Sequence, residues 1–105
     1  MTDVIQEIAA ERRRQVEEEG WTAEHDDEHA DGEMAVAAAC YATVAAWPEK
    51  SRASASTLHA RPPFWPWATS WWKPKDRRRD LIRAGALIVA EIERLDRAQP
   101  GGSDD

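Results

Sequence analysis

GEMAVAAACYATVAA, residues 32–46, decides the fold, because nearly all of its side chains are small and favour an α-helix. A second stretch, DLIRAGALIVAEIERLDRA (residues 80–98), carries large apolar residues at helical spacing, with Gly85 and Ala86 in its middle. Small residues let neighbouring helix backbones approach closely. The two stretches therefore predict two long helices whose small residues allow close packing against a neighbouring helix.

Working outward, the sequence predicts three helices. The first runs from Thr2 to about Glu19, the second begins within 22–31 and runs to about Ala46, and the third runs from about Asp76 to Ala98. Asp3 and Asp76 are expected N-caps, and Gly20 suits a left-handed C-terminal cap. In the first helix, a spacing of three or four residues predicts one solvated face formed by Glu7, Glu11, Arg14 and Glu18.

The fold class expected is all-α, because signals for strands are essentially absent. A single helical domain is expected over 1–98, with a disordered tail at 99–105. A long loop, 48–75, joins the second and third helices; it holds five of the six prolines and four of the six tryptophans. Three helices with short apolar faces make a thin core. We therefore expect an oligomeric helical bundle, in which the small-residue faces of the second and third helices meet their symmetry mates.

Charge is divided along the chain of 105 residues, whose formal net charge is −6. Residues 1–33 carry 12 acids and 3 bases, a local −9, whereas residues 50–83 carry 9 bases and 2 acids, a local +7. The acidic total argues against general duplex nucleic-acid binding, but the positive segment allows a small anionic ligand. No apolar run is long enough to span a membrane, and the N-terminal residues lack the order of basic, apolar and small residues that a secretory signal has. Cys40, the lone cysteine, is expected to be a small buried hydrophobe, which fits a reducing, cytoplasmic setting.

The first candidate site lies in EGWTAEHDDEHADGE, residues 19–33. If residues 25–33 are helical, His25, His29 and Glu33 share one face, with Asp26 at its edge. Mg²⁺ would use the carboxylates Asp26, Asp27 and Glu33, and Zn²⁺ or another transition metal, the second choice, would use the imidazoles. The alternative is a solvated acidic helix start whose acids complement the helix dipole.

The second candidate site is the Trp-rich stretch and the basic run after it, PFWPWATSWWKPKDRRRD. Indole faces stack on bases, and cations neutralise phosphates, so this combination suits a nucleotide. The expected nucleotide-binding residues are Trp65, Trp67, Trp71, Trp72, Lys73, Lys75, Arg77 and Arg78. The alternative is that the tryptophans cover a core that Ala-rich helices leave thin, with one or two of them facing a ligand.

The third candidate site is AEIERLD, at the end of the third helix. Glu93 and Asp96 form an E-x-x-D pair on one face, and Glu91 lies three residues before Arg94. Solvated salt bridges explain this pattern. The alternative is that Glu93 and Asp96 complete a metal site with acids from the second helix.

Several strings resemble small proteins encoded by bacteriophages and prophages. ERRRQVEEEGWTAEHDDEHADGEMAVAAACYA, PFWPW and WWKPKDRRRDL match E-x-x-R-Q, E-G-W-T-x-E-H-D-D-x-H, G-E-[LM]-A, W-P-W and W-W-K-P motifs in the same order. The resemblance covers about residues 7–97. It implies a phage-type origin and carries no assigned activity with it.

A weaker resemblance, through GEMAVAAACYA and EIERLD, is to the all-α NTP pyrophosphatases of the MazG and dUTPase type. It implies an Mg²⁺-dependent nucleoside triphosphate pyrophosphohydrolase, with Glu33, Asp26 and Asp27 as catalytic residues that hold the metal. In those enzymes the first motif is E-x-x-E, whereas here Ala30 stands three residues before Glu33. The alternative function is a non-catalytic phage counter-defence protein that sequesters a nucleotide signal or binds a host defence protein.

Overall fold

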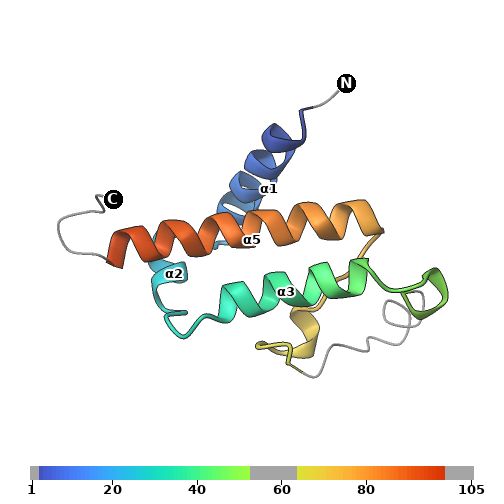
Figure 1. Cartoon of the computed structure of the whole chain (residues 1–105). Coiled ribbons are helices and arrows are strands. Elements are labelled where there is room, and N and C mark those ends of the chain that lie inside the picture. Colours follow the sequence, from blue (N-terminus) through green and yellow to red (C-terminus); the bar gives the residue numbers. More distant parts are fainter. Residues whose placement is uncertain (1–2, 53–63, 99–105) are drawn as a thin grey trace.

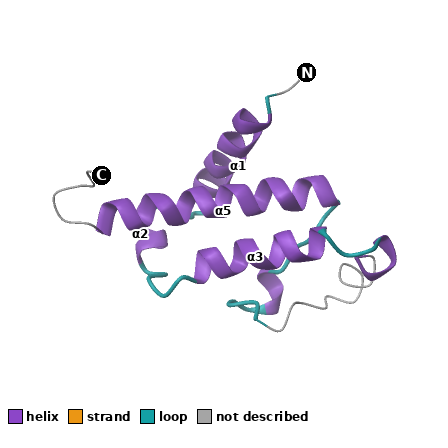
Figure 2. Ribbon diagram, viewed as in Figure 1, coloured by secondary structure: helices purple, strands orange, loops and turns teal. Residues whose placement is uncertain are grey.

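The computed structural model describes residues 3–52 and 64–98, and these form an all-α fold. The elements are α1 (Val4–Glu18), α2 (Ala23–Asp27), α3 (Glu33–Ala45), a short 3₁₀ turn η1 (Thr69–Trp71) and α5 (Arg77–Ala98). The described residues contain no strand, as Figure 2 shows. The predicted tail at 99–105 and residues 53–63 of the predicted loop lie outside the described residues.

Helices α3 and α5 lie side by side and run in opposite directions (Figure 1). Their facing surfaces are built of small residues that are almost completely buried, namely Ala37, Ala38, Ala84 and Ala90. Met34, Val44 and Leu87 fill the remaining space. The prediction of close packing through small residues is confirmed. The small-residue faces that we expected to meet symmetry mates instead pack against each other within one chain.

Helix α1 crosses α5 at Gly85, where the absence of a side chain allows the crossing. A methyl group added there would lie 2.9 Å from Ile8 Cδ1. The predicted solvated face of α1 is wrong at Glu11, which is buried together with Gln15. Glu11 accepts hydrogen bonds from Arg14 (2.9 Å) and Gln15 (3.2 Å) and pairs with Arg79 of α5. This buried ion cluster ties α1 to the start of α5.

The predicted second helix is broken in two. Helix α2 ends at Asp27, a turn follows, and Gly32 in the left-handed region (φ 85°) precedes α3. The start of the second helix was uncertain by several residues, since many of the residues there can cap a helix. The break means that His25, His29 and Glu33 belong to three different local structures.

The helix ends follow the sequence signals. The side chain of Asp3 accepts a hydrogen bond from Ile5 N (2.9 Å), and that of Asp76 accepts one from Arg79 N (2.8 Å). Gly20 has φ 78°, the left-handed conformation that ends α1. Among the described residues, no helix combines the length and the hydropathy that crossing a bilayer requires.

Most of the large apolar residues of α5 face away from the rest of the chain. Leu81, Ile88, Ile92 and Leu95 are 47–52% exposed, although Ile82 is buried. The continuous apolar face predicted from spacing is therefore present, but the α3 contact uses the Ala and Leu87 face instead. This leaves a stripe of half-exposed apolar side chains along α5.

The close α3–α5 contact predicts that Ala38→Leu destabilises the protein. Ala38 is 2% exposed, and added methylene groups in a tightly packed interface cost about 1–3 kcal/mol. The neighbouring variant Ala39→Leu is the control, since Ala39 is exposed on the same helix. Urea denaturation should show a lower midpoint for Ala38→Leu alone. Equal midpoints for the two variants would contradict the close packing.

The buried cluster around Glu11 predicts a dependence of stability on pH. Burial raises the pKa of Glu11, but the hydrogen bond from Arg14 and the charges of Arg14 and Arg79 outweigh burial, so the pKa lies below its ordinary value of 4.5. A carboxyl with a lowered pKa stabilises the folded state above its unfolded pKa, and this stabilisation is lost as pH falls through the folded pKa.

We therefore expect Glu11→Gln to lower the unfolding free energy by about 1–3 kcal/mol at pH 7 and to change it less below pH 4. Glu18→Gln, at an exposed site on the same helix, serves as the control. Thermal unfolding from pH 3 to pH 7 measures both. An identical loss at every pH would show that Glu11 does not contribute through its charge.

Candidate functional site

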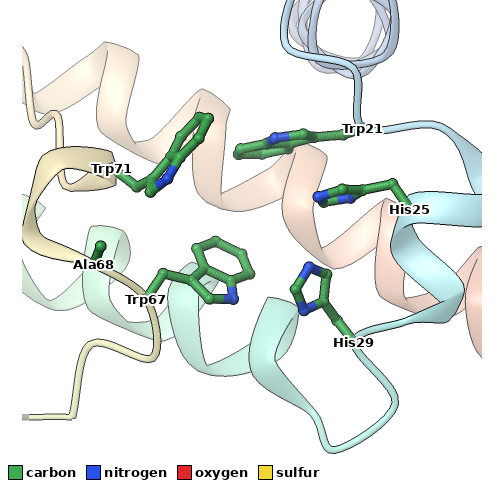
Figure 3. A pocket seen from close by; sticks show the side chains of 6 residues that line it. All are labelled: Trp21, His25, His29, Trp67, Ala68 and Trp71. Carbon is green, nitrogen blue, oxygen red and sulfur yellow. The ribbon is translucent and has the colours of Figure 1, made fainter.

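A pocket of about 270 Å³ opens between the end of α1, α2 and the segment that contains η1. Its walls are almost entirely aromatic. The lining residues are Trp21, His25, His29, Trp67, Ala68 and Trp71 (Figure 3). The pocket thus combines one part of the acidic N-terminal region with one part of the Trp-rich loop.

The three indole rings are tilted relative to one another around the hollow, and one imidazole is parallel to an indole. Trp21 and Trp71 lie on one side of it and Trp67 and His29 on the other (Figure 3). The Trp21 ring is tilted by 57° to Trp67 and by 50° to Trp71, with centroids 5.9 and 6.4 Å apart. His25 is parallel to Trp21 within 4°, and the His25 and His29 rings are 4.8 Å apart. Several aromatic faces are therefore available to one flat or cationic group.

Trp21 is placed by the way α1 ends. Gly20 takes the left-handed conformation, and Trp21 N then donates a hydrogen bond back to Gln15 O (3.0 Å). Thr22 caps α2 by accepting a hydrogen bond from His25 N (3.3 Å). Two consecutive helix-end signals, at Gly20 and Thr22, thus bring Trp21 and His25 to the same wall.

Arg12 holds this wall against α1 and α5. Its Nη1 donates to Trp21 O (3.1 Å), and its Nη2 donates to Asp26 Oδ2 (2.6 Å). Its Nε lies 3.4 Å from Glu93 Oε1. Asp26 is fully buried, and its second oxygen lies 3.3 Å from His25 Nδ1. Arg12 therefore positions Trp21 directly and His25 through Asp26.

Glu33 lies beside the other imidazole. Its Oε2 is 3.7 Å from His29 Nδ1, and its Oε1 accepts a hydrogen bond from Asp31 N (2.9 Å). Hydrogen bonds from its own backbone N–H and from that of Asp31 lower the pKa of Glu33, aided by His29. Each histidine of the pocket thus lies beside a carboxylate, His25 beside Asp26 and His29 beside Glu33.

The four tryptophans of the loop divide into two pairs. Trp65 (6% exposed) and Trp72 (3%) belong to the core, where both pack against Tyr41. Trp67 and Trp71 line the pocket, and Trp71 is 43% exposed. The two core tryptophans match the interpretation that the loop covers a thin core, and the other two stand where a ligand can reach them.

The carboxylates predicted to bind a metal do not converge. Asp26 is paired with Arg12, Asp27 with Arg97 (2.8 Å), and Asp96 lies exposed near the end of α5. Glu93 is brought near Asp26 only through the shared Arg12. Within residues 3–52 and 64–98, no three His, Cys, Asp or Glu side chains are close enough to hold one metal ion. The side chains in this arrangement do not fit Mg²⁺ or Zn²⁺.

The predicted phosphate-binding cations also separate. Lys73 Nζ lies 5.3 Å from the centroid of the Trp71 ring, but Lys73 does not line the pocket. Arg77 donates to Trp47 O (2.9 Å) and pairs with Glu49, whereas Arg78 pairs with Glu7 at 2.6 Å. Lys75 contributes its carbonyl oxygen to Arg52. Of these four cations, Lys73 is the one that lies over a ring of the pocket wall.

Sequence reasoning missed Trp21 as a pocket residue and assigned His25 and His29 to a metal. The signal was the Gly20-Trp21 pair, which predicts that Trp21 folds back onto α1, but it does not tell what Trp21 meets. Trp67 adds a polar feature, because its buried Nε1 has no hydrogen-bond partner among the described residues. This nitrogen lies on the side of the ring that faces His29 (Figure 3).

The chain matches no family model, no curated protein and no solved structure.

The role of Arg12 predicts that Arg12→Met opens the pocket wall. Asp26 would remain buried without its cation, and removing one partner of a buried ion pair costs about 3–5 kcal/mol. Arg12→Lys should also fail to restore the wall, since a lysine cannot bond Trp21 O, Asp26 and Glu93 through one planar group. The control is Arg13→Met, because Arg13 is exposed. Near-UV circular dichroism of the tryptophans should change in both Arg12 variants, and a native spectrum in Arg12→Met would contradict the assignment.

Proposed function

We propose that the protein binds a nucleotide without hydrolysing it, with the base in the pocket formed by Trp21, Trp67 and Trp71. The observation that carries this proposal is the convergence of three indole rings and two imidazoles on one hollow. Stacking of a base on an aromatic side chain contributes about 1–3 kcal/mol and tolerates different bases. The volume of about 270 Å³ is slightly below the usual range of about 300–1,000 Å³ for ligand pockets, which suits one base better than a whole nucleotide.

Polar groups at the walls give the base its orientation. Trp67 Nε1 is a buried donor without a partner, and an unpaired buried donor costs about 1–3 kcal/mol. A ring nitrogen or carbonyl oxygen of a base would accept from it once the ring turns this nitrogen, which has almost no accessible surface, toward the pocket. The two imidazoles supply further donors or acceptors, depending on their tautomers. These groups match the edge of a nucleobase better than that of a plain hydrocarbon ring.

The phosphate lies outside the pocket in this proposal, toward Lys73. The ammonium group of Lys73 lies over the Trp71 ring, whereas Arg77 and Arg78 are engaged with Glu49 and Glu7. A single cation beside the pocket wall supports a modest contribution from phosphate. The base therefore supplies most of the affinity.

Binding without turnover is supported by the ion pairs that the carboxylates already form. Hydrolysis through a metal would require Asp26, Asp27 and Glu33 to face one ion, and Asp26 and Asp27 already have arginine partners on two other helices. Sequestration of a nucleotide signal is thus the version of the function that fits this arrangement. A second version, in which the acidic face binds a host defence protein, stays a prediction from the sequence.

A second candidate ligand is an alkylammonium cation. The tilted indoles form walls around a hollow instead of a parallel pair, and Asp26 and Glu33 stand behind the two histidines. Rings arranged in this way, close to carboxylates, attract quaternary ammonium groups. This ligand would compete with a base for the same pocket.

The proposal predicts that Trp71→Ala weakens nucleotide binding by about 5- to 150-fold, which corresponds to the loss of one stacking contact. Isothermal titration calorimetry with the four nucleosides and their 5′-monophosphates, with and without Mg²⁺, measures this. Phe64→Ala is the matched control, because Phe64 is similarly exposed and does not line the pocket. Lys73→Ala should weaken the monophosphates and leave the nucleosides unchanged.

The same titrations test the competing ideas. Chromatography after incubation with triphosphates should recover them intact, and release of pyrophosphate would overturn binding without turnover. If titration with tetramethylammonium releases or absorbs heat and titration with every nucleoside and nucleotide does not, the ligand of the pocket is a cation and not a base. Equal nucleotide affinities of the Trp71→Ala and Phe64→Ala variants would show that the base does not bind in this pocket.

A further inference from the structure

We propose that the apolar stripe of α5 binds a second copy of this chain, with the two α5 helices antiparallel. The stripe consists of Leu81, Ile88, Ile92 and Leu95, each about half exposed. Neither α1 nor α3 covers it. An exposed row of large apolar side chains on a helix of 22 residues indicates an interaction surface.

The spacing of the stripe fits a copy of itself. Leu81, Ile88 and Leu95 recur every seven residues, the repeat that forms a seam between paired helices. Leu81 and Leu95 are equally far from Ile88 along the helix. A two-fold axis at Ile88 therefore places Leu81 of one copy opposite Leu95 of the other at both ends, which is the self-complementarity that an isologous interface requires.

The charges at the two ends of α5 differ, although most of them already have partners within the chain. Arg77 and Arg78 at its start pair with Glu49 and Glu7, and Glu93 near its end lies 3.4 Å from Arg12. Asp96 is exposed near the same end, where Arg97 pairs with Asp27. An antiparallel pair brings Asp96 of each copy toward the arginines at the start of the other helix. A parallel pair would place like charges together at both ends, which costs stability.

Helix α1 adds further exposed apolar residues near its start. Ile8 contacts Gly85 in the middle of α5, and Val4 and Ile5 lie on the same side of α1 as Ile8, one turn earlier. Val4 is 50% exposed and Ile5 71%. The chain thus exposes large apolar residues on two helices that contact each other. The small core of this domain would gain stability from burial of these residues.

Disulfide cross-linking tests both the contact and its orientation. Under mild oxidation, Ile88→Cys should form a covalent dimer, because the two-fold axis brings the two copies of position 88 within disulfide reach. Leu81→Cys alone should form no disulfide-linked dimer, because its two copies in the non-covalent dimer would be about 21 Å apart along the helix axis. A mixture of Leu81→Cys and Leu95→Cys should give the heterodimer. Cys40 does not interfere, because it is buried and burial raises its pKa to about 11.

The variant Ala39→Cys, on the exposed face of α3, is the control for cross-linking by random collision. Circular dichroism of each reduced variant shows whether it is folded. Sedimentation velocity of the unmodified protein should give a mass twice the 11.8 kDa of one chain. The Ile88→Asp variant should sediment with the mass of a single chain. Cross-linking of Leu81→Cys as efficient as that of Ile88→Cys would overturn the antiparallel orientation. A monomer at all concentrations would overturn the interface, whatever the pocket binds.

Discussion

The guanidinium group of Arg12 makes the contacts on which the arrangement of the pocket depends. It joins the carbonyl of Trp21, the buried carboxylate of Asp26 and the exposed carboxylate of Glu93. These partners lie after α1, on α2 and on α5, so one side chain fixes three segments relative to one another. Because Asp26 is fully buried, its charge needs this partner. The five-residue helix α2 is too short to hold its place alone.

The thin core explains why the tryptophans serve two purposes. Alanines allow α3 and α5 to pack closely, but they bury little surface per residue. Trp65 and Trp72 supply that surface: both contact Tyr41, and their ring centroids are 4.9 Å apart. Their burial fixes the segment between them, which carries Trp67 and Trp71 into the pocket wall. The same short segment therefore contributes to stability and forms the proposed binding surface.

Much of the fold follows from the sequence, because its strongest signals are local. The Ala-rich run, the caps at Asp3 and Asp76 and the left-handed Gly20 predicted the helices and most of their ends. The break after Asp27 and the burial of Glu11 were not predictable in the same way. The break lies among residues that can all cap a helix and is followed by the left-handed Gly32, whereas the burial of Glu11 depends on Arg79, a distant partner that periodicity does not reveal. The site was predicted as two separate sets of residues, and the pocket takes His25 and His29 from one set and Trp67 and Trp71 from the other.

The central claim is that three of the six tryptophans contact a base while the other three do not. The indole N–H signals in a ¹H–¹⁵N correlation spectrum, assigned by single Trp→Phe variants, report on each ring during titration with a nucleoside monophosphate. The account predicts that the signals of Trp21, Trp67 and Trp71 shift and saturate together. Those of Trp47, Trp65 and Trp72, which do not line the pocket, should stay nearly unchanged. Shifts confined to this second group, or no saturable shift with any nucleotide, would contradict the claim.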